Sequence, residues 1–152
     1  MIVETVRQQI SEAAQRDEKL VILVGRPGSG KSRILRQFSK NNYLDLKEEL
    51  SKRLLSIPRE KRSERAFSLL QEIVESKQEP VLLFDNIEIL FLQELDMDPL
   101  KVLGRLSREK TLVVAWVGYF DGTELSWSEP GRPDYKTFSI KERDLLISSI
   151  LD

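Results

Sequence analysis

The sequence contains no cysteine and no histidine. Their absence excludes disulfide bonds, thiolate zinc sites, cysteine nucleophiles and every catalytic triad that needs an imidazole base. An excess of charge of one sign is also lacking, since 24 basic and 25 acidic residues leave a formal net charge of −1. A nearly neutral chain gives no general signal for nucleic acid or an anionic membrane. Chemistry is left to carboxylates, lysine, arginine, hydroxyls, backbone amides or a bound cation that prefers oxygen.

Long apolar runs are missing as well. No stretch reaches the length of about 18 apolar residues that a transmembrane helix needs. The N-terminal segment MIVETVRQQISEAAQRDEK has no apolar signal core. We therefore expect a cytoplasmic protein without a membrane anchor. With 152 residues, the chain is long enough to bury a real core, and we expect a single domain over 1–152.

Short apolar runs alternate with helical patterns along the chain. This alternation predicts an α/β protein with a mostly parallel sheet. Apolar strands are expected at 19–25, 80–85 and 111–118, short strands at 43–46 and 136–140, and a hairpin within 119–129. Helices are expected at 2–16, 31–41, 47–55, 59–77, from an Asp98 N-cap to about 107, and at 141–152.

The segment GRPGSGKS, residues 25–32, fits the pattern G-x-x-x-x-G-K-[ST] at every fixed position. Glycines let the backbone curl until successive N–H groups face one point, and the following helix directs its positive end there. Lys31 is predicted to reach the terminal phosphates of ATP or another NTP, and Ser32 to ligate Mg²⁺. The alternative is a chance match by a glycine-rich turn. The predicted nucleotide contacts are Gly25, Arg26, Pro27, Gly28, Ser29, Gly30, Lys31, Ser32 and Arg33.

The strand VLLFD ends in an acid, Asp85. Proteins with such a loop hold Mg²⁺ from its other side with an aspartate at the end of a neighbouring buried strand. Asp85 is therefore predicted as the second metal ligand, although it could instead cap the segment that follows. Asp45, near the end of YLDL, is a weaker candidate. We expect Asp45 to cap the helix that starts at Lys47 instead.

Hydrolysis is less well supported than binding. ATPases that activate water with a carboxylate normally carry a glutamate directly after the aspartate, but here Asn86 stands there and cannot accept a proton. Glu88 is the nearest substitute, because a helical turn would return it to the side of Asp85. Alternatively, Glu88 is a solvated residue or pairs with an arginine. The end of the next strand also lacks a polar sensor, since Trp116 offers one N–H donor and Val117 none.

An arginine from a neighbouring subunit would stabilise charge on a transferring phosphoryl group. The leading candidate is Arg132 in PGRPDY, because Pro130 and Pro133 make that loop rigid. Arg105 and Arg108, near the end of the preceding helix, are further candidates. Each of these arginines is more often a plain surface cation.

A family resemblance is carried by LVILVGRPGSGKS, YLDLKEELSKRLL, VLLFDNIEILF, DPLKVLGRLSREKTLVVAWVG and GRPDY. In this order, over nearly the whole chain, they are similar to BrxF, the small P-loop protein of bacterial BREX phage-defence systems. The resemblance implies a nucleoside-triphosphatase-type domain that acts beside other defence subunits, with Lys31, Ser32 and Asp85 as nucleotide and Mg²⁺ residues. In that family an asparagine commonly stands at the place of Val117. Its absence here implies weaker hydrolysis, or a water positioned from elsewhere.

The leading hypothesis is a Mg²⁺-dependent ATPase or nucleotide switch that assembles with itself or with other defence subunits. The expected fold is a P-loop NTPase three-layer sandwich, a minimal AAA+- or ASCE-like core without a helical lid. One alternative is a nucleotide-binding assembly module that does not hydrolyse, which Asn86 and Val117 favour. Another is a small-molecule or nucleotide kinase, although the late segment supplies only Arg132 for the lid that a kinase needs. Contact with DNA has no support from the charge.

Overall fold

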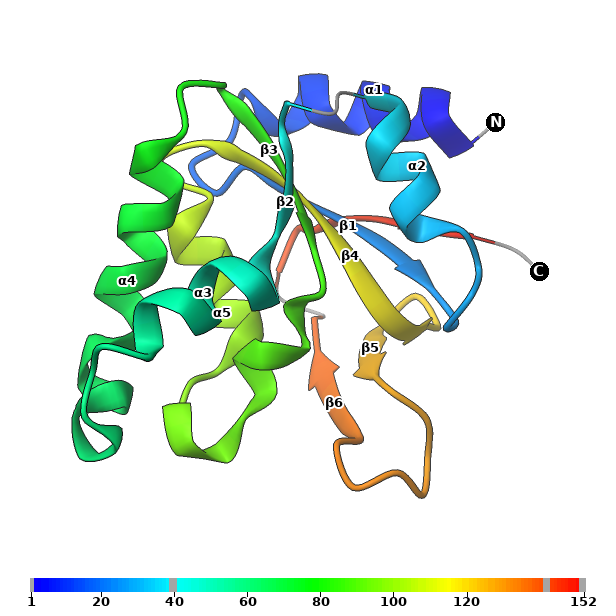
Figure 1. The fold of residues 1–152 in the computed structure, drawn as a ribbon. Helices are drawn as coiled ribbons and strands as arrows, with labels where there is room; N and C mark the ends of the chain where they lie inside the picture. The colour runs from blue at the N-terminus through cyan, green and yellow to red at the C-terminus, as the bar shows by residue number, and fades with distance from the viewer. Residues whose placement is uncertain (1, 39–40, 141–142, 151–152) are drawn as a thin grey trace.

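The computed structural model describes residues 2–38, 41–140 and 143–150 of the chain, and Figure 1 shows how helices and strands alternate along it. The α-helices are α1 (Ile2–Ala13), α2 (Lys31–Phe38), α3 (Leu46–Leu54), α4 (Arg62–Ser76) and α5 (Pro99–Leu106). Short 3₁₀ helices are η1 (Arg59–Lys61), η2 (Ile87–Phe91) and η3 (Gln93–Leu95). The strands are β1 (Leu20–Gly25), β2 (Tyr43–Asp45), β3 (Val81–Asp85), β4 (Thr111–Phe120), β5 (Glu124–Trp127), β6 (Lys136–Ser139) and β7 (Leu146–Ser149).

The main sheet is parallel. Its strands lie side by side in the order β2-β3-β4-β1-β7. The end of β4 continues past this sheet and pairs with β5, which pairs with β6, and both of these pairings are antiparallel. The predicted α/β class, the mostly parallel sheet and the hairpin after β4 are therefore confirmed.

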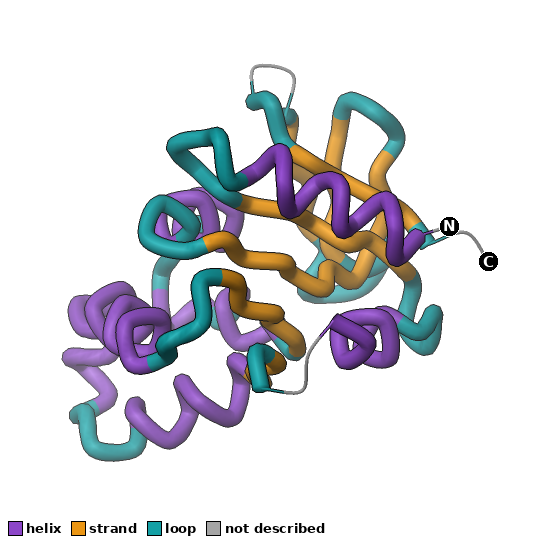
Figure 2. Tube along the Cα trace, turned by 90° about the horizontal axis from the view of Figure 1, so that it is seen from above, coloured by secondary structure: helices purple, strands orange, loops and turns teal. Residues whose placement is uncertain are grey.

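Helices cover both faces of the sheet, as Figures 1 and 2 show. Along β1, Leu20, Ile22 and Val24 belong to the larger core, which also includes residues of α3, α4 and α5. Val21 and Leu23 belong to the smaller core, together with residues of α1 and α2. Because alternate residues of a strand point to opposite faces, a strand covered on both sides must be apolar throughout. This is why β1 and β4 read as unbroken apolar runs in the sequence.

Helix starts follow local capping chemistry. Asp98 caps α5, where its carboxylate accepts from the backbone N–H groups of Leu100 and Lys101 at 3.1 and 3.2 Å, and Pro99 opens the helix. The predicted N-cap at Asp98 is therefore confirmed. In the described part of the chain, no helix is both long enough and apolar enough to cross a bilayer.

The prediction of a closing helix at 141–152 is wrong where the structure describes that segment. Residues 146–149 form β7, which pairs in parallel with the outer edge of β1. Leu146 is buried, and the Ser148 hydroxyl donates to the side-chain oxygen of Gln9 on α1 at 2.6 Å. Without β7, the backbone groups of β1 would lack partners on that side. Residues 141–142 and 151–152 of the predicted helix lie outside the described residues.

Parallel strands place their carboxyl ends along one edge of a sheet, and open α/β sheets bind their ligands at that edge. Here the strand register sets Gly25 beside Val117, and Asp45 beside Asp85. The end of β1, where the phosphate-loop motif begins, and the end of β3, where Asp85 lies, are thus on the same edge with β4 between them.

Candidate functional site

The segment GRPGSGKS forms a tight loop between β1 and α2. Gly28 and Gly30 have φ angles of 79° and 97°, in the left-handed region that glycine adopts readily. At Gly25 space is limited instead, because a Cβ there would overlap the Ser29 hydroxyl, which would have to turn away. The N–H groups of the first turn of α2 follow at once and, with the helix dipole, favour an anion beside the loop.

Lys31 reaches back into the loop. Its ammonium group donates to the carbonyl oxygens of Gly25 at 3.0 Å and Arg26 at 2.8 Å, and to the Ser29 hydroxyl at 3.2 Å. The residue is only 7% exposed. Anionic oxygens are stronger acceptors for an ammonium group than neutral carbonyls. Lys31 is therefore placed to exchange these acceptors for the oxygens of an anion that enters the loop.

Ser32 and Asp85 meet across the sheet edge. The Ser32 hydroxyl, on the helix α2 that follows β1, donates to Oδ2 of Asp85 at the end of β3 at 2.5 Å, although β4 lies between β1 and β3. Oδ1 of Asp85 accepts from the backbone N–H of Asn86 at 2.9 Å. Asp85 is 6% exposed, so both carboxylate oxygens lie in a largely dehydrated setting. The structure thus brings together the two residues that the sequence predicted as metal ligands.

These two groups have the chemistry that Mg²⁺ selects. The ion prefers hard oxygen ligands and is usually held by one or two carboxylates together with waters and substrate phosphates. A cage of several acidic residues is not its usual site. In the part of the chain that the structure describes, no group of three or more Asp, Glu, His or Cys side chains could hold a metal ion. One hydroxyl and one carboxylate beside an anion-binding loop therefore fit Mg²⁺ bound along with a phosphate.

Tyr43, which the sequence did not single out, is a third partner of this site. Its hydroxyl donates to Oδ2 of Asp85 at 2.5 Å. Burial, and after it the hydrogen bond to Asp85, raise the pKa of Tyr43 to about 12. The guanidinium of Arg36 lies 4.8 Å from the centre of the tyrosine ring. The only signal available was that Tyr43 opens a short strand, and the contact depends on how β2 pairs with β3.

Asp45 caps α3, as predicted, and also holds Asn86. Its Oδ1 accepts from the backbone N–H of Glu48 at 3.0 Å, and its Oδ2 accepts from the side-chain amide of Asn86 at 2.8 Å. Asn86 has φ 55° and ψ 53°, a left-handed conformation that asparagine tolerates better than most residues. The side-chain amide of Asn86 is therefore already hydrogen-bonded to Asp45, the last residue of β2.

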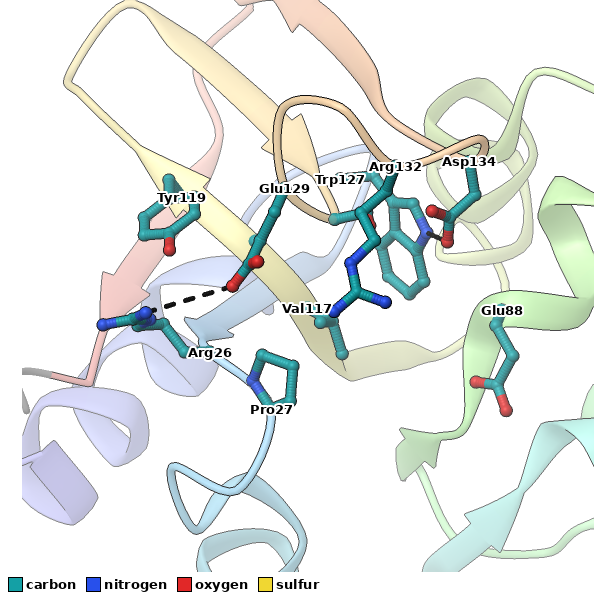
Figure 3. Close-up of a pocket in the computed structure, with 11 residues that line it drawn as sticks. Arg26, Pro27, Glu88, Val117, Tyr119, Trp127, Glu129, Arg132 and Asp134 are labelled. Carbon is teal, nitrogen blue, oxygen red and sulfur yellow. Dashed lines mark hydrogen bonds and ion pairs between the residues drawn. The ribbon is translucent and has the colours of Figure 1, made fainter.

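A cavity of about 410 Å³ opens beside the loop, with Arg26 and Pro27 of the loop in its wall. Glu88 of η2 and Arg132 of the segment between β5 and β6 also line it, so the structure brings two further predicted residues to one space. Figure 3 shows the Arg132 side chain extending toward Val117, with Glu88 to one side. Glu88 is exposed to the cavity and is not hydrogen-bonded to Asp85.

The other predicted donors lie elsewhere. Arg105 stacks on Phe67, with its guanidinium carbon 4.0 Å from the ring centre, and Arg108 pairs with Glu18 at 3.3 Å. Neither is among the described residues that line the cavity. Trp116 is fully buried and donates its ring N–H to the Ser126 carbonyl at 2.9 Å. Its single donor is therefore already used within the hairpin.

The wall of the cavity formed by the hairpin is anchored by aromatic packing that the sequence did not reveal. Trp127 of β5 stacks on Phe91 of η2 with ring centres 4.1 Å apart, and Trp116 meets Trp127 edge-on at 5.3 Å. The ring N–H of Trp127 donates to Asp134 at 3.3 Å. These aromatic residues are visible in the sequence, but their meeting depends on strand pairing over long separations.

No family model matches the chain, and no curated protein matches it. Among solved structures, the structure of C. elegans PCH-2 is similar to that of this chain, with 15% sequence identity and a TM-score of 0.48. The match covers 99% of this chain and 41% of that chain, so this chain spans about two fifths of the length of that protein. Function is therefore inferred from the geometry of the site itself.

Proposed function

We propose that the chain binds ATP, or another NTP, together with Mg²⁺ through the loop at 25–33. The observation that supports this most strongly is the 2.5 Å contact between the Ser32 hydroxyl and Asp85. P-loop NTPases hold Mg²⁺ between the hydroxyl that follows the loop lysine and an aspartate from another buried strand. The sequence motif specifies the hydroxyl, and the fold delivers the carboxylate to it. On this proposal the fold is a P-loop sandwich with a minimal AAA+-like core.

Each group near the loop has a defined task in this proposal. Backbone N–H groups of the loop and of α2 hold the phosphates, and Lys31 turns from the loop carbonyls to the terminal phosphate oxygens. Tyr43 and Ser32 fix the orientation of the Asp85 carboxylate. Bound Mg²⁺ would neutralise charge on the β- and γ-phosphates.

Turnover is proposed to be weak or dependent on a partner. Asn86 cannot take a proton from water, and its amide is held by Asp45 at 2.8 Å. Glu88 lines the cavity beside the loop and is the carboxylate left to orient a water. The state of Asn86, which cannot accept a proton and whose amide is held by Asp45, and the apolar Val117 favour a second candidate function, a nucleotide-binding assembly module that does not hydrolyse.

The biological setting proposed here rests on the similarity of the motifs to BrxF. On that basis the protein acts in the cytoplasm within a phage-defence complex, beside other subunits or further copies of itself. Co-purification with the remaining components of such a system, with and without ATP, tests this part of the proposal separately from nucleotide binding.

Calorimetric titration with Mg²⁺-ATP tests the central proposal. We expect Lys31→Ala to weaken binding about 100-fold or more, because the variant loses a charge-assisted contact to phosphate. Glu88→Gln should keep wild-type affinity and lose whatever phosphate release the wild type shows, whereas Glu72→Gln, an exposed position on α4, should change neither property. Wild-type protein that binds no nucleotide would refute the proposal. Binding without phosphate release at any protein concentration would select the module that does not hydrolyse.

A further inference from the structure

Four separate segments of the chain line the cavity beside the loop. Arg26 and Pro27 belong to the loop, Val117 to β4 and Glu88 to η2, while the segment 127–134 closes another side, as Figure 3 shows. Its volume of about 410 Å³ exceeds what a single water needs, about 30 Å³. The space therefore has room for a phosphate group and several waters beside a nucleotide held by the loop.

Two charged side chains that face this cavity have no partner among the residues that the structure describes. Among the charged side chains that line it, Arg26 lies 4.0 Å from Glu129, and Asp134 accepts from the ring N–H of Trp127. Within the described residues, Arg132 and Glu88 form no side-chain hydrogen bond or ion pair, either with each other or with a third group. An exposed cation and an exposed carboxylate on the same cavity, left unpaired, suit a ligand that arrives from solution.

The position of Arg132 is set by its own chain. The backbone N–H of Arg132 donates to the Glu129 carbonyl, and the backbone N–H of Tyr135 donates to the Arg132 carbonyl, both at 3.1 Å. The strand before this turn carries Trp127, which stacks on Phe91 at 4.1 Å. Phe91 lies on η2, the same short helix that carries Glu88. The helix η2, which carries Glu88, thus packs directly on β5, the strand that leads into the turn with Arg132.

We propose that Arg132 acts within its own subunit, where its guanidinium contacts the terminal phosphate of the nucleotide and Glu88 holds the attacking water. This inference rests on the proposed function and replaces the expectation that Arg132 serves a neighbouring subunit. The water oxygen bonds to the γ-phosphorus while the bond from that phosphorus to the β,γ-bridging oxygen breaks, and its electron pair leaves with ADP. One proton of the water stays on the inorganic phosphate, and the other passes through Glu88 to solvent. Arg132 remains protonated and offsets the charge that moves.

The first test compares affinities for Mg²⁺ complexes of a non-hydrolysable ATP analogue and of ADP, so that it does not depend on turnover. A contact to the terminal phosphate predicts that Arg132→Ala weakens analogue binding about tenfold or more and changes ADP binding less than about twofold. The affinity of Arg132→Lys for the analogue should lie between those of the wild type and Arg132→Ala, because lysine keeps the positive charge but lacks the planar guanidinium group. Arg65→Ala, which removes an exposed arginine from α4, should leave both affinities unchanged. Equal affinity of Arg132→Ala and wild type for the analogue would overturn the inference.

The second test separates action within a subunit from action between subunits. Arg132→Ala has an intact loop, and Lys31→Ala has an intact Arg132, so an arginine acting between subunits would restore tight analogue binding when Lys31→Ala is added in excess. We expect no restoration. Recovery of wild-type affinity in the mixture would show that Arg132 serves a neighbour and would overturn the inference while leaving the proposed function standing. Wild-type protein that binds neither nucleotide would instead overturn the proposed function, and this inference with it.

Discussion

Asn86 has a position of catalytic interest and also a structural role, which the sequence alone could not distinguish. It stands where a catalytic glutamate would be expected, and it also occupies a left-handed backbone position with its amide on Asp45 at 2.8 Å. A glutamate at this position would meet the Asp45 carboxylate with like charge and would adopt that backbone less readily. The residue is therefore explained by local structure before any catalytic role is considered.

From this we predict that Asn86→Glu does not raise ATP turnover and lowers the free energy of unfolding by about 1–3 kcal/mol. Urea denaturation and a phosphate-release assay measure the two effects. Asn86→Gly is the matched control, because glycine keeps the left-handed backbone and loses only the hydrogen bond, so it should cost less. An increase in turnover for Asn86→Glu would mean that position 86 reaches the attacking water after all.

Tyr43 gives a prediction about pH. Its pKa is raised to about 12 in the folded protein, from an ordinary value of 10.0, first by burial and then by the hydrogen bond to Asp85. The neutral phenol is thus favoured by folding, so its contribution to stability is complete below pH 10 and is lost as the pH rises toward 12. In paired denaturation curves, the stability of wild type relative to Tyr43→Phe should therefore fall between pH 10 and 12. A constant difference across that range would contradict this reading of the contact.

At the scale of elements, Gly118 controls how the hairpin leaves the sheet. It is the first residue of β4 to pair with β5, and a Cβ there would overlap the Ser126 carbonyl oxygen. Because that carbonyl also accepts from the ring N–H of Trp116, the backbone cannot move away without straining this partly buried hydrogen bond. Gly118 thus sets the approach of the wall that carries Arg132.

We predict that Gly118→Ala lowers the free energy of unfolding by about 2–4 kcal/mol, the range for a buried clash combined with a strained hydrogen bond. Tryptophan fluorescence should also change, because Trp116 and Trp127 both belong to the affected hairpin. Gly122→Ala is the control. It lies in the exposed turn with no atom near its would-be Cβ, so it should show backbone strain alone and a smaller loss. Equal losses for the two variants would show that the close approach at Gly118 is not decisive.

Elements whose structure depends on neighbouring residues could be predicted from the sequence, whereas elements that depend on long-range pairing could not. The strand β1, the glycine loop and the start of α2 depend on residues close together in the chain, so their pattern is visible locally. The strand β7 was missed because it forms against the open edge of β1, and a short apolar run carries no sign of that edge. Tyr43 and the cavity at Arg132 were hidden for the same reason, since β2 pairs with β3 and Trp127 meets Phe91 only in the folded chain.

For the whole molecule, the proposed Mg²⁺ site joins two parts of the sheet. Ser32 follows β1 and Asp85 ends β3, so one ion held by both would connect strands that β4 separates. A ligand that binds only the folded state stabilises it by about 2.7 kcal/mol when present at about 100 times its dissociation constant. For a protein of this size, that stabilisation corresponds to a rise in melting temperature of about 5–10 °C.

We therefore predict that ATP with Mg²⁺ raises the melting temperature of the wild type by this amount, and that ATP with a chelator raises it by clearly less. In Asp85→Asn the difference between the two conditions should largely disappear, because the carboxylate that holds the ion is gone while the loop remains. Comparing the shift within each variant removes any change in the stability of the ligand-free protein. If Asp85→Asn kept the full Mg²⁺-dependent shift, the ion would be held by the loop and the phosphates alone. The contact between Ser32 and Asp85 would then serve to pack β3 against the loop, with no part in nucleotide binding.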